Sequence, residues 1–320
     1  MGDWAIGRLG DWRRVADWDA VIRELEATGD YRVLRRLVPQ PSYGAPDDSP
    51  RKRALILDTE TTGLDPRTDR IIELALLPFE YSSGSGAITD IGAPVTFLED
   101  PGRPIPPEVV DLTGITDAMV AGQRIDDAAA SRELEAASLI VAHNAAFDRP
   151  FVDRRLPVSR GKAWGCSLRE VPWRGAGYAS SALEFLLIKK SRLFFDGHRA
   201  EADCHALLHL LGTPFEDGIS PLRHLLDSAR QPTIRLWAIG APFEQKDALK
   251  ARRYRWSNGE DGRPKSWFRE VRATDLEGET AWLKASVYGG REGWKVEKLT
   301  AKERYAESGQ PRANGDPAVS

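Results

Sequence analysis

A short apolar run that ends in two acids is the feature that most constrains what this chain can fold into. Residues 54–57 read Ala-Leu-Ile-Leu, and Asp58-Thr59-Glu60 follows directly, before Thr61-Thr62-Gly63-Leu64. The run predicts a buried strand, and because strand side chains alternate between faces, Asp58 and Glu60 should point the same way. Two close carboxylates raise each other's pKa unless a cation lies between them, and Mg²⁺ and Mn²⁺ prefer oxygen ligands. The plain alternative is a solvated strand end.

Composition indicates a globular protein of about two domains. The chain has 320 residues, of which 41% are hydrophobic and 29% charged, with a net charge of −3; these values exclude a disordered or fibrous chain. Cys166 and Cys204 are too few for a disulfide framework or a zinc site and indicate a reducing compartment, so we expect a cytoplasmic protein. The N-terminus shows no basic leader before an apolar core, and no apolar run approaches roughly 18 residues, so we expect neither export nor membrane insertion.

The pattern of residues divides the chain into five parts. Residues 1–38 have apolar positions at helical spacing and predict a helical N-terminal extension, in two helices, that packs elsewhere in the molecule. Residues 39–52 are rich in proline and small polar residues and predict a linker. Residues 53–213 carry strands and then strands alternating with helices, which predicts an α/β mixed sheet flanked by helices. Residues 221–299 predict a small α+β domain, and residues 300–320 a disordered tail.

Three blocks of chemically versatile residues follow one another in the chain. They are Asp58-Thr59-Glu60-Thr61-Thr62-Gly63-Leu64, His143-Asn144-Ala145-Ala146-Phe147-Asp148 and His198-Arg199-Ala200-Glu201-Ala202-Asp203. Together they resemble the DnaQ-like exonucleases, and the histidine five residues before the last aspartate resembles the DEDDh branch, which includes the DNA polymerase III epsilon-subunit exonuclease group. The resemblance covers residues 53–213. It implies an RNase H-like fold and a 3′→5′ exonuclease that acts on DNA 3′ ends, single-stranded ones above all, in proofreading or repair.

The resemblance also implies roles for the site residues. Four acids would hold two Mg²⁺ ions, with Mn²⁺ as a plausible substitute: Asp58, Glu60, Asp148 and Asp203. A pair of divalent ions suits phosphodiester hydrolysis. His198 would be the general base, because imidazole changes protonation near neutral pH. Five residues would contact the substrate: Thr61, Leu64, His143, Asn144 and Phe147. For Leu64 a packing role is an equal alternative, and Asn144 is equally suited to capping the following helix.

The region after residue 221 leaves two interpretations open. Residues 246–272 carry nine basic and four acidic residues, a net charge of +5, with aromatic residues between them. Tyr254, Trp256, Trp267 and Phe268, beside arginines 252, 253, 255 and 269, could form a surface that stacks bases and binds phosphates. They could equally form the core and the solvated charges of a small folded appendage.

Two other functions compete with a DNA exonuclease. The first is 3′→5′ trimming of RNA, because the acid chemistry does not inspect the 2′-hydroxyl. The second is a non-catalytic module that binds DNA or a DNA polymerase. The intact set of four acids and one histidine argues against the second.

Overall fold

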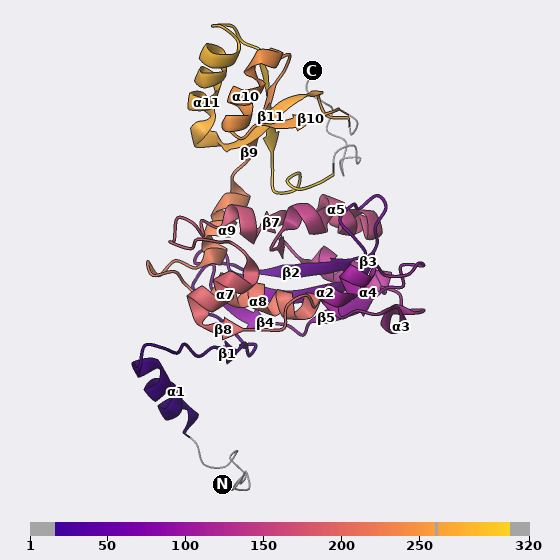
Figure 1. Ribbon diagram of the computed structural model, residues 1–320, viewed down its shortest axis with the longest axis vertical. Helices are drawn as coiled ribbons and strands as arrows, with labels where there is room; N and C mark the ends of the chain where they lie inside the picture. Colours follow the sequence, from indigo (N-terminus) through magenta and orange to yellow (C-terminus); the bar gives the residue numbers. More distant parts are fainter. Residues whose placement is uncertain (1–16, 260–261, 308–320) are drawn as a thin grey trace, which may run out of the picture.

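The computed structural model describes residues 17–259 and 262–307. Figure 1 shows three parts: an N-terminal segment, a central domain built on a large sheet, and a small domain. We define the central domain as residues 51–230 and the small domain as residues 233–299. None of the helices in these described ranges is long and apolar enough to cross a membrane.

The central domain is organised around a mixed sheet. Its strands are β2 (Arg51–Thr61), β3 (Ile71–Ser82), β4 (Ile88–Ile91), β5 (Val95–Leu98), β6 (Ile140–Ala142) and β7 (Trp164–Cys166). The order is β4-β3-β2-β6-β7, with β5 also paired to β3. Strands β3, β4 and β5 form an antiparallel half, whereas β6 and β7 run parallel to β2. This mixed order is the RNase H-like sheet that was expected, and the apolar run at residues 54–57 forms its central strand.

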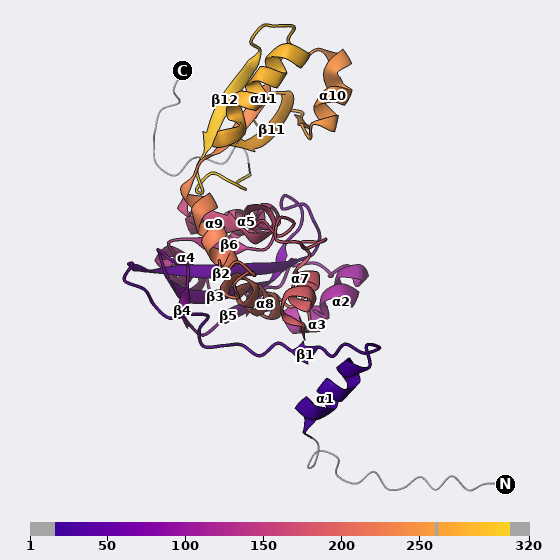
Figure 2. The same ribbon diagram turned by 90° about the vertical axis from the view of Figure 1, so that its left-hand side faces the viewer.

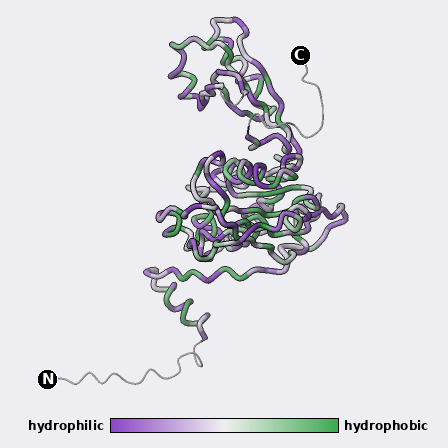
Figure 3. The backbone as a smooth tube through the Cα atoms, turned by 90° about the vertical axis from the view of Figure 1, so that its right-hand side faces the viewer, coloured by the Kyte–Doolittle hydropathy of each residue, from purple (hydrophilic) through white to green (hydrophobic). Residues whose placement is uncertain are grey.

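Helices cover both faces of this sheet. They are α2 (Pro107–Thr113), α3 (Asp117–Val120), α4 (Asp127–Ala136), α5 (Ala145–Arg155), α6 (Ser167–Glu170), α7 (Leu183–Ser191), α8 (Ala200–Gly212) and α9 (Pro221–Arg230). On β2, Leu55 and Leu57 pack in one core cluster with residues of α4 and α5, while Ala54 and Ile56 pack in another with residues of α7, α8 and α9. Figure 3 shows apolar residues gathered between these layers. The alternation along β2 therefore decides which helix each of its side chains faces.

Helix α9 corrects the expected domain boundary. The exonuclease-like region was expected to end at residue 213 and the next domain to begin at residue 221. Leu222, Leu225 and Leu226 of α9 are instead buried in the core cluster that includes α8. The side chain of Leu225 lies so close to Gly165 on β7 that a Cβ atom there would meet it at 2.7 Å. The boundary therefore falls between residues 230 and 233.

The N-terminal segment also differs from expectation. Helix α1 (Trp18–Ala27) is present, but it buries none of its residues, and Trp18 is 53% exposed. The expected second helix is replaced by β1 (Arg35–Arg36), which pairs in parallel with β8 (Leu193–Phe194). Hydrogen bonding of the extended backbone to β8 therefore overrides the helical spacing of the apolar residues in this segment. In Figure 2, α1 projects from the central domain, to which Glu26 links it through an ion pair with Arg192 at 3.0 Å. Residues 1–16, including Trp4 and Trp12, lie outside the described residues.

The predicted linker, residues 39–52, is attached to the central domain. Tyr43 forms an isolated bridge with Ile88, and its hydroxyl lies 3.1 Å from His209 Nδ1. Its ring lies so close to Gly212 that a Cβ atom there would overlap it, at 2.4 Å. The last two linker positions already belong to β2.

The small domain has the α+β composition that was expected. Its elements are β9 (Thr233–Ala238), α10 (Lys246–Ala251), β10 (Arg255–Ser257), β11 (Ser266–Arg272), α11 (Leu276–Trp282) and β12 (Trp294–Leu299). The antiparallel order β10-β11-β9-β12 together with the chain order βαββαβ defines a ferredoxin-like topology. Strand β12 had no counterpart among the sequence predictions.

Residues 300–307 are not the disordered tail that was expected. The Ala301 carbonyl accepts a hydrogen bond from Trp164 N at 2.8 Å, which continues the edge of the central sheet. Arg304 is 5% exposed, and its guanidinium lies 2.7 Å from Glu170. Arg149 of α5 donates to the Arg304 carbonyl at 2.5 Å. The chain therefore returns from the small domain to the central one; residues 308–320 lie outside the described residues.

Candidate active site

Asp58 and Glu60 lie near the end of β2 on the face that α8 covers. Both are half-buried, whereas Thr59 between them is buried on the opposite face. Asp203 reaches them from the first turn of α8. Ligand oxygens of Asp58, Glu60 and Asp203 all lie within 4.8 Å of one another. The structure thus brings together three of the four predicted acids, from positions about 140 residues apart in the chain.

The fourth predicted acid, Asp148, approaches from the first turn of α5. It is 3% exposed, and its Oδ1 accepts a hydrogen bond from Thr59 Oγ1 at 2.9 Å. This bond holds Asp148 outside the group of three. Among the neighbouring carboxylates, however, Asp148 contributes most to raising the pKa of Asp58, so it belongs to the same electrostatic cluster.

Burial and repulsion from neighbouring carboxylates raise the pKa values of all four acids. Burial is the main cause for Asp58, followed by Asp148, Asp203 and Glu60. Burial and then Asp203 raise the pKa of Glu60 to about 8. Burial raises the pKa of Asp148 to about 7 and that of Asp203 to about 6, in both cases against hydrogen bonds that lower it. Oxygen donors that are hard to ionise without a counter-charge fit a divalent metal ion.

Glu73 and Arg199 are functional candidates that sequence reasoning missed. Glu73 lies opposite Glu60 in the pairing of β2 with β3 and is 1% exposed. Arg199 Nη2 donates to its Oε1 at 2.7 Å, and Ala200 N donates to its Oε2 at 2.9 Å. A buried carboxylate needs such partners, so this pair fixes the start of α8. The available signal was an acid inside the apolar run Ile71-Ile72-Glu73-Leu74-Ala75.

His198 immediately precedes this anchored residue. It is exposed and has a left-handed backbone conformation, with φ of 62°. The interaction with His198 lowers the pKa of Asp203, whose Oδ2 also accepts a hydrogen bond from Arg199 N at 3.1 Å. The imidazole is therefore presented to solvent beside the acid cluster. Glu201 and His205 on α8 stay outside the cluster, and Glu201 accepts a hydrogen bond from Thr96 at 2.8 Å.

The loop after β2 carries two of the predicted substrate contacts. Leu64 is 83% exposed, which rules out the packing role that was its alternative. Thr61 is buried, and its hydroxyl donates to the Gly63 carbonyl at 2.6 Å, so it shapes the loop. A Cβ atom at Gly63 would lie 2.5 Å from Asp69 Oδ2, which explains the glycine. Asp69 in turn accepts a hydrogen bond from Asp65 N at 3.0 Å, which closes the loop beneath Leu64.

The remaining predicted contacts lie before α5. His143 has both ring nitrogens engaged: Nε2 lies 2.8 Å from the Ser181 carbonyl and therefore donates, while Nδ1 lies 2.6 Å from the Ser167 hydroxyl. Asn144 is exposed at the N-cap position of α5, but its side chain makes no capping hydrogen bond, so that alternative is wrong. Phe147 is half-buried and packs against Phe151. Of these residues, Asn144 is the one with an exposed side chain.

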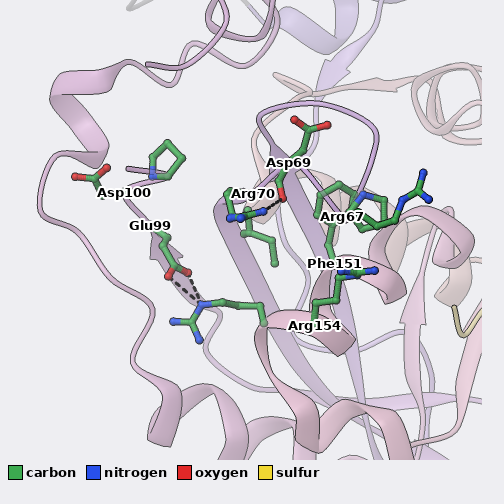
Figure 4. Close-up of a pocket in the computed structure, with 11 residues that line it drawn as sticks. Arg67, Asp69, Arg70, Glu99, Asp100, Phe151 and Arg154 are labelled. Atoms are coloured by element: carbon green, nitrogen blue, oxygen red, sulfur yellow. Dashed lines mark hydrogen bonds and ion pairs between the residues drawn. The ribbon is translucent and has the colours of Figure 1, made fainter. Parts of the chain in front are cut away.

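Two cavities are lined by residues outside the acid cluster. Figure 4 shows the first, of about 300 Å³, where Arg67, Arg70 and Arg154 surround Phe151 behind the loop after β2. Arg154 is paired with Glu307 at 2.7 Å. The second, of about 350 Å³, lies between the N-terminal segment and the loop that carries His198. None of the four acids lines either cavity among the described residues.

Similarity to known proteins adds to this geometry. The Exonuclease family model, RNase_T, matches residues 55–159. Over 187 residues the chain is 30% identical to DNA polymerase III subunit epsilon of Treponema pallidum, covering 56% of this chain and 83% of that relative. This chain belongs to the DnaQ-like exonuclease superfamily. The match to the family model ends before α8, so His198 and Asp203 lie beyond it.

The DnaQ-like domain also resembles parts of larger proteins and a solved nuclease. It is 33% identical over 125 residues to the PolC-type DNA polymerase III of Bacillus subtilis, covering 38% of this chain but 7% of that protein. A structure of Exonuclease X in complex with 5′-overhanging duplex DNA is 27% identical, with a TM-score of 0.38, and the match covers 53% of this chain and 99% of that one.

Proposed function

We propose that this DnaQ-like protein is a metal-dependent 3′→5′ exonuclease that removes nucleotides from the 3′ ends of single-stranded DNA. The observation that carries the proposal is the convergence of Asp58, Glu60 and Asp203, with Asp148 beside them, at a site where burial and repulsion raise every carboxyl pKa. Bound cations would offset the repulsion among the four carboxylates and so favour their ionised form.

The donor set favours hard divalent cations, with Mg²⁺ as the proposed cofactor and Mn²⁺ as a substitute. Asp58, Glu60 and Asp203 would hold the cations, and Asp148 would complete the set by releasing its bond to Thr59. When bound, a pair of such ions activates water and neutralises the charge of a phosphodiester undergoing displacement.

The chain's own residues would supply the remaining steps. His198 would accept the proton of the attacking water at an imidazole nitrogen, as the histidine of a DEDDh set. The ion pair between Glu73 and Arg199 would hold the backbone next to His198 in place for this transfer. Leu64 projects from the loop after β2 and would contact the terminal base, and the exposed side chain of Asn144 would contact the same strand end.

The substrate class rests on a different observation. The relative that is 30% identical over 187 residues is a subunit of a DNA polymerase, which supports DNA as the substrate and proofreading or repair as the setting. A DNA polymerase is accordingly the proposed protein partner.

An end-labelled substrate tests the proposal directly. With Mg²⁺, a single-stranded DNA labelled at its 5′ end should yield a ladder of shortened labelled fragments, and EDTA should stop the reaction. The Asp203→Asn variant should be inactive, whereas Glu201→Gln, on the same helix but outside the acid group, should remain active. Immediate release of the 5′ label as a mononucleotide would contradict the polarity. Faster degradation of RNA of the same sequence would contradict the substrate.

A further inference from the structure

Helices cover one face of the small domain's sheet, and no helix of the described residues packs on the other, which we call the open face. Ile234, Leu236 and Ala238 of β9 pack in apolar clusters with residues of α10 and α11 or the turn that follows α11. Because side chains alternate along a strand, Arg235 and Trp237 project from the other face. Figure 2 shows both helices on the same side of the strands.

Four side chains form a row across this open face. The register pairs Arg255 of β10 with Phe268 of β11, Phe268 with Trp237 of β9, and Trp237 with Lys295 of β12. The rings of Phe268 and Trp237 have centroids 5.0 Å apart. Arg255 and Lys295 are exposed at the two ends. We call these four residues the aromatic row: two rings flanked by two cations.

The next row explains why the charges of the aromatic row are available. Arg235 lies between two acids, 2.6 Å from Glu270 and 3.6 Å from Glu297. Trp237 Nε1 donates to Glu297 at 2.9 Å, which fixes the orientation of the indole. These acids are thereby committed to Arg235. Within the described residues, neither Arg255 nor Lys295 has a carboxylate at ion-pair distance.

Three of the other basic and aromatic residues of this region serve the fold of the small domain. Arg252 and Arg269 both pair with Glu279, at 3.0 and 2.7 Å, and the hydroxyl of Tyr254 donates to the same carboxylate at 3.0 Å. Glu279 is 4% exposed, so this cluster is internal. The residues that the sequence suggested as one surface therefore lie in different places. Of them, Phe268 and Arg255 lie on the open face, next to Trp237 and Lys295.

We propose that the aromatic row binds single-stranded DNA, with a base on Phe268 and phosphates on Arg255 and Lys295. The proposal rests on the proposed function for the identity of the strand. Sheets with aromatic rings on their central strands stack unpaired bases, and flanking cations bind the backbone. The row supplies both in one line across four strands, at a site separate from the acid cluster.

Binding requires Arg255 to move. Phe268 is 6% and Trp237 2% exposed, and arginines lie over both rings. The guanidinium of Arg255 is 4.8 Å from the Phe268 centroid, and that of Arg235 is 5.6 Å from the same centroid and 5.7 Å from the Trp237 centroid. An exposed cation–π contact is worth less than base stacking, so a base replaces Arg255 on the ring while Arg255 turns to a phosphate. Arg235 stays, since two acids hold it, so Trp237 remains covered and supports the neighbouring Phe268 ring.

A circular single-stranded DNA tests the aromatic row apart from the exonuclease site, because a circle has no 3′ end. Binding of the full chain would be measured by fluorescence anisotropy in EDTA, which prevents metal-dependent cleavage. Phe268→Leu, which keeps an apolar side chain but removes the ring, should weaken binding about tenfold. The double variant Arg255→Ala with Lys295→Ala should weaken it at least as much and flatten its salt dependence.

Trp256→Leu is the matched control. Trp256 is 51% exposed but pairs with Trp267 on the helix side of the same sheet, so its loss should leave binding unchanged. Failure of the circle to bind would overturn the proposal, as would a loss of binding in Trp256→Leu but not in the variants of the aromatic row. An RNA circle that binds more tightly than the DNA circle would overturn the assignment to DNA.

Cleavage of a short linear DNA by the same variants separates the two proposals. All aromatic-row variants should cleave it at the wild-type rate. If the wild-type protein binds the circle but cleaves nothing, the proposed function fails while the aromatic row stands. Thermal unfolding of Phe268→Leu verifies that the small domain remains folded.

Discussion

Replacing Asp58 with Asn should stabilise the metal-free protein, which is the opposite of the usual effect of changing a half-buried residue. Ligand oxygens of Asp58, Glu60 and Asp203 lie within 4.8 Å of one another. Two full charges at that separation repel by about 3.5 kcal/mol at an effective dielectric constant of about 20. Proton uptake by Glu60, whose pKa burial raises to about 8, relieves part of this repulsion. We therefore expect the free energy of unfolding to rise by about 2 kcal/mol, within the usual range for one substitution.

The pH dependence of this effect has a definite sign. Burial raises the pKa of Asp58 well above its ordinary value, whereas in the unfolded chain an aspartate titrates near about 4. Below that pH the Asp58 carboxyl is protonated in both the folded and the unfolded state, so its ionisation does not affect the free energy of unfolding. As the pH rises above about 4, the unfolded state ionises more readily, so the folded wild type loses stability relative to the variant. The difference should be large near pH 8, where Glu60 also titrates.

Thermal unfolding followed by circular dichroism measures this effect. In EDTA near neutral or mildly alkaline pH, Asp58→Asn should raise Tm by about 4–8 °C. Adding Mg²⁺ should raise Tm of the wild type but not of the variant. Glu201→Gln, which removes an acid of α8 outside the cluster, should keep the wild-type response to Mg²⁺. A lower Tm of Asp58→Asn in EDTA, or an equal Mg²⁺ shift in both proteins, would refute the reasoning.

Three further changes and one control substitution test the surroundings of the site. Glu73→Gln should lower kcat about tenfold with KM little changed, because the start of α8 loses its buried ion pair; steady-state kinetics that show a rise in KM alone would contradict this. Deleting residues 1–38 should lower kcat severalfold, because β1 pairs with β8 just before His198. Arg36→Ala, which removes an exposed ion pair worth about 0–1 kcal/mol, should have almost no effect in the same assay. Arg149→Met should destabilise the central domain by about 3–5 kcal/mol in urea, since it leaves a buried aspartate unpaired, and an unchanged midpoint would refute that role.

The acid cluster could be predicted because two local rules combine. Alternation along β2 places Asp58 and Glu60 on one face, and that holds for any strand with this sequence. The sequence pattern placed Asp203 in the first turn of one helix and His198 in the loop just before it. That α8 would lie across β2 on the same face as the two acids is a property of the whole fold, and only the resemblance to a known superfamily anticipated it.

The parts that sequence reasoning missed depend on partners far away in the chain. Strand β7 has three residues, too few to show an alternation of apolar and polar side chains, and its pairing with β6 makes it a strand. Residues 300–307 are polar and were expected to be disordered, but Arg149 and Trp164 supply hydrogen bonds to their carbonyl groups. The role of Glu73 was missed for the same reason, because its partner Arg199 lies 126 residues later in the chain. A polar residue inside an apolar run signals a buried partner without saying which.

Metal binding tests the central claim most directly, and Mn²⁺ allows it to be seen by anomalous diffraction from soaked crystals. The account predicts Mn²⁺ in direct contact with carboxylate oxygens of Asp58, Glu60 and Asp203, with Asp148 turned towards the ions. Crystals that bind Mn²⁺ elsewhere, with no anomalous signal at these three carboxylates, would contradict it.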